Sequence, residues 1–201
     1  MNRPNKKGLK NILIVTLGVL GLLGIISGIL LWLVTSPAPT NDWGVSWITT
    51  SDDALASLNG KIKTLQNDIN NASTGKVFVL TITEEEATAK LDQYARQGNI
   101  SIETYVPQVH FKEGLLLFSA RIHIGVRAEM AIQITVEAVD GKADFTIRRL
   151  DLGRVTIPRT LVNNVMTAVE HEVVGHWDKQ PVVVNKIAVE EGVLKVTMEK
   201  K

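Results

Sequence analysis

The stretch LLLFSARIHIGVRAEMAIQITVEAVDGKADFTIRRLDL, residues 115–152, alternates apolar and polar side chains. A period of two predicts β-strands with one apolar face and one wet face. Turns at Gly125 and at Asp140-Gly141 divide the stretch into three strands joined as hairpins. The alternation slips by one residue at Arg148-Arg149, which predicts a β-bulge. The stretch therefore reads as an antiparallel meander.

Further strands flank this meander on both sides. Residues 76–82 and 100–111 precede it, and Pro107 interrupts the second of these strands. Residues 182–190 and 193–200 form a closing hairpin. The pattern predicts an α+β fold in which a curved antiparallel sheet of about six strands packs on amphipathic helices.

Three helices are predicted around the strands. The first covers residues 51–72, with Ser51 as its N-cap. The second starts at Thr83, where Thr83 and Glu86 form a capping box and the glutamates Glu84 to Glu86 are expected to be solvated partners of the helix dipole. The third runs from Pro158 to about residue 174. These helices are expected to cover the apolar face of the sheet.

An uncharged apolar stretch lies near the N-terminus, at residues 12–34. As a helix it would span roughly 34 Å, enough to cross a hydrocarbon core about 30 Å thick. Basic residues precede it without any acid, which favours a cytoplasmic N-terminus: Arg3, Lys6, Lys7 and Lys10. We expect a single-pass protein of the cell membrane, with a basic cytoplasmic tail (1–11), a transmembrane anchor (12–34), a juxtamembrane linker (35–50), an amphipathic helix (51–75) and an extracytoplasmic domain (76–201).

The anchor leaves two alternatives open. Gly24 and Gly28 form a small-xxx-small pair that would let two membrane helices approach as a homodimer, although glycine is also common in membrane helices in general. Trp43 and Trp47 either join Trp32 in an interfacial aromatic belt or pack on the domain. A cleaved signal peptide is disfavoured, because its apolar region is normally only about 7–15 residues long.

The composition argues against several classes of function. The net charge is +1, so no basic field for nucleic acid is visible, and the absence of cysteine excludes thiol chemistry and cysteine metal sites. The segment His171-Glu172-Val173-Val174-Gly175-His176 resembles the zinc-protease pattern, but its second histidine is five residues along instead of four. His110 and His123 are expected to face solvent. A non-enzymatic protein without metal or cofactor is therefore expected, with a zinc hydrolase as a distant third hypothesis.

Residues 78–198 resemble the LmeA-like phospholipid-binding family and the related YpmS-like family of membrane-anchored bacterial proteins. Three features carry the resemblance: the helix opened by Leu80-Thr81-Ile82-Thr83-Glu84-Glu85-Glu86, the hairpins ending in Leu152-Gly153-Arg154-Val155-Thr156-Ile157-Pro158, and the helix after Pro158 with its closing hairpin. The resemblance implies a tubular-lipid-binding-like fold, in which a curved sheet wraps a helix and encloses an apolar groove.

The resemblance also implies that the domain binds a lipid, with phospholipid as the ligand class and the bilayer as its partner, in envelope lipid handling. Candidate groove residues are the apolar side chains of the meander and of the third helix: Leu116, Phe118, Ile122, Met130, Ile132, Ile134, Phe145, Leu161, Val165, Met166 and Val169. An ordinary packed core would show the same pattern. The alternative function is a structural or interaction scaffold of the cell envelope that binds no ligand.

Overall fold

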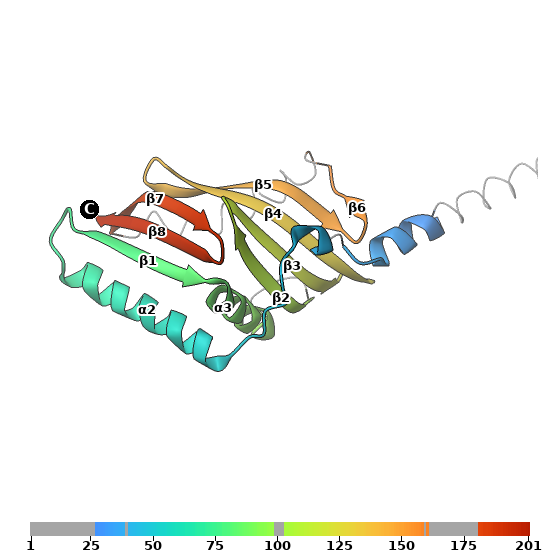
Figure 1. The fold of residues 1–201 in the computed structure, drawn as a ribbon, viewed down its shortest axis with the longest axis horizontal. Helices are drawn as coiled ribbons and strands as arrows, with labels where there is room; N and C mark the ends of the chain where they lie inside the picture. The colour runs from blue at the N-terminus through green and yellow to red at the C-terminus, as the bar shows by residue number, and fades with distance from the viewer. Residues whose placement is uncertain (1–26, 39, 99–102, 159, 161–180) are drawn as a thin grey trace, which may run out of the picture.

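The predicted meander forms the centre of a five-stranded antiparallel sheet (Figure 1). The computed structural model describes residues 27–38, 40–98, 103–158, 160 and 181–201. The sheet has the order β2-β3-β4-β5-β6, with these bounds: β2 Glu103–Lys112, β3 Leu115–His123, β4 Arg127–Val139, β5 Lys142–Leu152 and β6 Val155–Thr156. The turn at Asp140-Gly141 is confirmed, and so is the bulge, because Ile147 and Arg149 pair with Ile134 and Gln133 and leave Arg148 unpaired between them.

Pro107 disrupts β2 as predicted. Tyr105 pairs with Arg121 and Gln108 with Ser119, so Val106 and Pro107 together lie opposite a single residue of β3. Val106 has a φ of 50°, a conformation that β-branched residues rarely adopt. The bulge therefore changes the direction of β2 between its exposed first half and its buried second half.

A second, three-stranded sheet has the order β1-β8-β7, formed by β1 Val77–Thr83, β8 Val193–Lys200 and β7 Val182–Glu190. The expected single sheet of about six strands is thus wrong, since the described residues form eight strands in two sheets. Hairpin turns of the large sheet meet the outer edge of β7: the Gly114 N–H donates to the Val189 carbonyl (2.9 Å) and the Val184 N–H to the Gly141 carbonyl (2.8 Å). Period-two patterning shows which face of a strand is apolar, but not which strand lies beside it.

Helices α2 (Asp52–Asn71) and α3 (Glu84–Arg96) begin at the predicted caps, Ser51 and the Thr83–Glu86 capping box. Ile69 of α2 packs with Phe78 and Met198 on the three-stranded sheet. α3 lies against β2 (Figure 1). Helices α2 and α3 therefore do not cover the apolar face of the five-stranded sheet, contrary to expectation. The third predicted helix lies outside the described residues except at its start.

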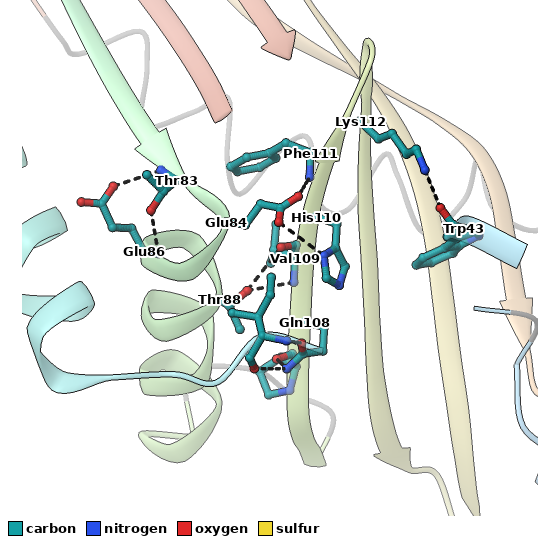
Figure 2. Close-up of polar contacts among 12 residues, drawn as sticks. Trp43, Thr83, Glu84, Glu86, Thr88, Gln108, Val109, His110, Phe111 and Lys112 are labelled. Atoms are coloured by element: carbon teal, nitrogen blue, oxygen red, sulfur yellow. Dashed lines mark hydrogen bonds and ion pairs between the residues drawn. The ribbon is translucent and has the colours of Figure 1, made fainter. Parts of the chain in front are cut away.

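Side chains of α3 close the outer edge of β2 (Figure 2). The hydroxyl of Thr88, which is fully buried, accepts a hydrogen bond from the Val109 N–H (3.0 Å) and donates one to the Val109 carbonyl (3.3 Å). The Glu84 carboxylate accepts the Phe111 N–H (2.7 Å). These contacts satisfy backbone groups that an edge strand would otherwise leave open for pairing.

Glu86 is buried, so the expectation of three solvated glutamates is wrong at this position. Its carboxylate forms an ion pair with Lys61 (2.7 Å) and accepts hydrogen bonds from the Ser57 hydroxyl (2.6 Å) and the Thr83 N–H (3.0 Å). Burial alone would raise the pKa of Glu86, but these partners together hold it below its ordinary value. The ionised carboxylate joins α2, α3 and the end of β1.

His110 is also buried, with 4% of its surface exposed, and the prediction that it faces solvent is wrong. It lies between α3 and β3, and its Nδ1 is 3.6 Å from a carboxylate oxygen of Glu84 (Figure 2). Burial lowers the pKa of His110, and the nearby Glu84 carboxylate opposes that shift only in part.

The His110→Gln variant is expected to remove a pH dependence of stability. Because burial lowers the pKa of His110 in the folded protein, the unfolded chain takes up a proton more readily, so acidification from pH 7.5 to 5.5 should lower the free energy of unfolding, by at most about 1.4 kcal/mol. The stability lost on acidification should be smaller in His110→Gln than in the wild type when denaturant unfolding is measured in micelles. His123→Gln is the exposed control, and equal losses in wild type and His110→Gln would contradict the prediction.

The linker (residues 35–50) lies on the face of the five-stranded sheet that carries Leu117 and Ala131. This face was expected to be exposed to solvent. Ala38 and Trp43 pack there against Leu117 and Ala131, and the 3-10 helix η1 (Thr40–Trp43) forms part of this contact. The Gln108 side chain accepts the Ile48 N–H (2.8 Å) and donates to the Ile48 carbonyl (3.1 Å). Trp43 is thus packed on the domain, whereas Trp47 is exposed.

Residues 27–35 are helical. No helix in the described ranges is long and apolar enough to cross a membrane, and most of the predicted anchor lies outside these ranges. Gly24, His171 and His176 lie outside them as well. A Cβ at Gly28 would have no atom within 4 Å, so a homodimer through this glycine stays a prediction.

Candidate functional site

The candidate groove residues that the structure describes share one face of the five-stranded sheet. Register places Leu116 opposite Ile134 and Phe118 opposite Ile132, while Phe145 of β5 lies opposite Val136 on the same side. We call this surface the apolar face: Leu116, Phe118, Ala120, Ile122, Ala128, Met130, Ile132, Ile134, Val136, Phe145, Ile147, Leu150 and Leu152. The four candidates of the third helix, Leu161, Val165, Met166 and Val169, lie outside the described residues.

Burial varies along the apolar face. Ile122 and Ala128 are buried at one end, whereas Phe118, Met130 and Ile132 keep part of their surface accessible. The buried end forms a cluster with Ala120, against which Val34 packs from the end of helix 27–35. The apolar face therefore starts at the segment that continues from the predicted anchor.

The β5–β6 turn fastens the same helix to the sheet. The Arg154 N–H donates to the Leu33 carbonyl (2.9 Å), and the Arg154 guanidinium lies over the Trp32 ring at 5.6 Å. Gly153 has a φ of 57° and lies against the carbonyl groups of Leu33 and Val34, where a Cβ would overlap their oxygen atoms. Figure 1 shows helix 27–35, in blue, at the end of the large sheet away from the three-stranded sheet.

A groove of about 570 Å³ with a mixed polar and apolar lining opens at this end of the sheet, and we call it the polar groove after its charged side chains. Thr35 and Pro37 of the linker line it together with three charged side chains of β3 and β4: Arg121, Arg127 and Glu129. Arg121 pairs with Glu129 (3.5 Å), and Glu129 also accepts the Ala38 N–H (3.1 Å). Ile122 and Ala128 line the groove as well and so belong both to it and to the apolar face.

Sequence reasoning missed this groove. Its charged side chains occupy the polar positions of alternating strands, where a solvated face is the ordinary interpretation. The groove forms only because the linker passes the end of β4 on its way to the opposite face and so adds a second wall beside these positions. No signal in the strands themselves predicts that crossing.

Glu103, Tyr105 and His123 form an exposed cluster, of which Tyr105 lines the groove. The Tyr105 hydroxyl donates to the Glu103 carboxylate, and His123 Nδ1 lies 3.0 Å from the same carboxylate. The hydrogen bond from Tyr105 is the main cause that lowers the pKa of Glu103, and the one from His123 contributes less. The hydrogen bond to the same carboxylate raises the pKa of Tyr105. His123 is solvent-exposed, as predicted.

Within the described ranges no group of three or more histidine or acidic side chains is placed to hold a metal ion. The acidic groups around the groove already have partners: Glu129 binds Arg121, and Glu103 binds Tyr105 and His123. Comparisons of the chain with protein-family models, curated proteins and solved structures give no match.

Proposed function

We propose that the protein is a membrane-anchored, non-enzymatic lipid-binding protein whose domain lies outside the cytoplasm and takes up a phospholipid acyl chain on the apolar face. The observation that carries the proposal is the continuity of this face with helix 27–35 through Val34. An acyl chain leaving the bilayer beside that helix would pass the end of the face that Val34 covers and would then contact the partly accessible side chains of Phe118 and Leu116. The predicted anchor and the resemblance to lipid-binding families support the same proposal.

The dimensions of the apolar face suit a single acyl chain. A strand rises about 3.4 Å per residue, so positions 116–122 extend over roughly 20 Å. One leaflet of a bilayer core about 30 Å thick holds chains of roughly 15 Å. Each methylene group exposed to water costs about 0.8 kcal/mol, so a chain that leaves the bilayer needs the apolar face to cover most of its length.

The polar groove would hold the headgroup of the same lipid. It is lined by Ile122 and Ala128 of the apolar face and by charged side chains of the opposite face, so the lipid would bend around this end of the sheet to reach it. Arg127 lines the groove, and a guanidinium recognises phosphate oxygens through paired N–H groups. The proposal therefore places the acyl chain on the apolar face and the phosphate near Arg127.

Phe118→Glu is expected to abolish lipid binding by the domain. The full chain would be reconstituted in phosphatidylcholine vesicles that contain a phospholipid with a photoactivatable group in its acyl chain, and lipid-bearing peptides would be located by mass spectrometry. A carboxylate in the path of the acyl chain should reduce adducts on β3–β5 at least about tenfold, because burying an unpaired charge costs more than 1.4 kcal/mol.

Val139→Glu is the matched control. Val139 lies on β4 as an exposed apolar residue of the opposite face, so the same charge there should leave the adducts unchanged. Adducts on residues 12–34 report on contact with the bilayer and serve as an internal reference in both variants. If Phe118→Glu keeps a folded exchange pattern and still labels β3–β5 at the wild-type level, the apolar face is an ordinary core.

A further inference from the structure

β1 is an edge strand, and the outer backbone groups of its residues Val77 and Val79 have no hydrogen-bond partner in the described part of the chain. The Lys200 N–H donates to the Lys76 carbonyl (3.0 Å), which fixes the alternation in which residues 78, 80 and 82 bond to β8. The backbone groups of Val77, Val79 and Thr81 therefore point away from the sheet. One contact confirms this direction, because the Lys61 ammonium donates to the Thr81 carbonyl from the outer side (3.1 Å).

Other strand edges in the described ranges are protected. Thr88 and Glu84 close β2, and the turns at Gly114 and Gly141 contact β7. β5 carries the short strand β6 at one end and a bulge with two arginines in its middle, both of which discourage pairing. β1 has neither a proline nor a bulge, and its side chains Val77 and Val79 are 53% and 60% exposed.

A groove of about 550 Å³ separates this edge from α2, which runs alongside β1 (Figure 1). The strand side is lined by residues 78–81. The helix side is lined by four side chains: Lys61, Thr64, Leu65 and Asp68. A groove between a helix and an open strand edge can receive an extended peptide, whose main chain bonds to the strand while alternate side chains face the helix.

The charges in the groove define the chemistry of its occupant. The Lys61 ammonium is already matched by Glu86 at 2.7 Å. Asp68 has no ion-pair partner among the described residues. The Lys76 ammonium lies over the Phe78 ring. The groove therefore presents an unmatched carboxylate beside the apolar side chains of Leu65, Phe78 and Leu80.

We propose that this groove binds an extended segment of another protein, which adds to β1 as a fourth strand of the small sheet. The segment has β-branched or other apolar residues at alternate positions and a lysine or arginine that reaches Asp68. Its main chain bonds to Val77, Val79 and the Thr81 N–H. This interaction surface is separate from the apolar face and does not depend on lipid binding.

The test uses the full chain in phosphatidylcholine nanodiscs and a displayed library of random eight-residue peptides. Enriched peptides should alternate apolar residues and carry a basic residue at one fixed position. N-methylation of alternate backbone amides in a synthetic enriched peptide should weaken binding about tenfold or more, because each methyl group removes a main-chain hydrogen bond and blocks the strand edge. The proposal is overturned if the enriched peptides lack this pattern. It is also overturned if the peptide keeps its affinity whether the odd-numbered or the even-numbered backbone amides are N-methylated.

Two variants locate the site. Asp68→Lys should change the preferred residue from basic to acidic, whereas Lys63→Glu, on the same helix but outside the groove lining, should leave the preference unchanged. Val79→Pro removes an N–H that β8 does not use, and it should abolish binding while the exchange protection of Phe78 and Leu80 amides persists. The same consensus selected by wild type and Asp68→Lys would overturn the assignment.

A second copy of the chain is the competing occupant, and the sequence allows a direct test because it contains no cysteine. Val79→Cys in vesicles should remain monomeric under mild oxidation if the edge is kept for another protein. If a disulfide-linked dimer forms rapidly, and adding an enriched peptide does not slow its formation, the edge is used for self-association and the proposal is overturned.

Discussion

Gly153→Ala should detach the β5–β6 turn from helix 27–35. The added methyl group would overlap the carbonyl oxygens of Leu33 and Val34, and the φ of 57° is unfavourable for any residue with a Cβ. The backbone strain alone costs about 1–2 kcal/mol, and displacing two main-chain groups brings the expected loss in free energy of unfolding to about 3 kcal/mol. Denaturant unfolding in micelles, followed by tryptophan fluorescence, measures this loss.

Gly125→Ala is the matched control for this prediction. Gly125 also has a positive φ, 87°, but a Cβ there would meet no atom within 4 Å. Its loss should therefore be limited to the backbone strain of about 1–2 kcal/mol. The overlap should also show locally, as faster exchange of the Arg154 amide, which donates to the Leu33 carbonyl. If both variants lose the same stability and the Arg154 amide stays protected, the helix does not contact the turn as described.

Glu86→Ala should have a comparably large effect on the other side of the molecule. It removes the acceptor shared by Lys61, Ser57 and the Thr83 N–H, and it also deletes one half of the capping box. Because Lys61 keeps 38% of its side chain exposed and can be rehydrated, we expect a loss of about 2–3 kcal/mol, below the 3–5 kcal/mol typical of a fully buried pair.

Glu85→Ala is the control, since Glu85 is the exposed neighbour that only accepts the Ser51 hydroxyl. It should cost no more than about 1 kcal/mol. The Lys61→Met variant combined with Glu86→Ala completes a double-mutant cycle, in which a coupling energy near zero would show that the ion pair does not join α2 to α3. The lowered pKa gives a further sign: the contribution of Glu86 is present above its ordinary pKa and is lost as the pH falls through its folded value.

Local patterns in the sequence predicted the elements well. The caps at Ser51 and Thr83, the turn at Asp140-Gly141 and the bulge at Arg148 are confirmed because each depends on neighbouring residues. The separation into two sheets was not predictable in this way, since it depends on contacts such as that of Gly114 with Val189. Burial of His110 and Glu86 was missed for the same reason, as their partners come from distant segments.

The candidate site, too, was predicted where it depends on local sequence patterns and missed where it depends on distant segments. The alternation in β3 and β4 predicted which side chains share the apolar face, and the register agrees with it. The polar groove depends on Thr35 and Pro37 crossing the end of a strand, an arrangement that no periodicity contains. Whether lipid occupies the apolar face stays a prediction until the Phe118→Glu experiment is done.

The linker that packs on the large sheet has a mechanical consequence. Val34 is held on one side of the sheet and Trp43 on the other, with Gly153 and Arg154 fixed to the helix between them. A loose tether would let the domain tumble about the helix, but this clasp makes helix and sheet turn as one piece. A rotation of the helix would therefore rotate the whole five-stranded sheet with it. The orientation of the domain relative to the helix is set by the contacts of residues 34–43.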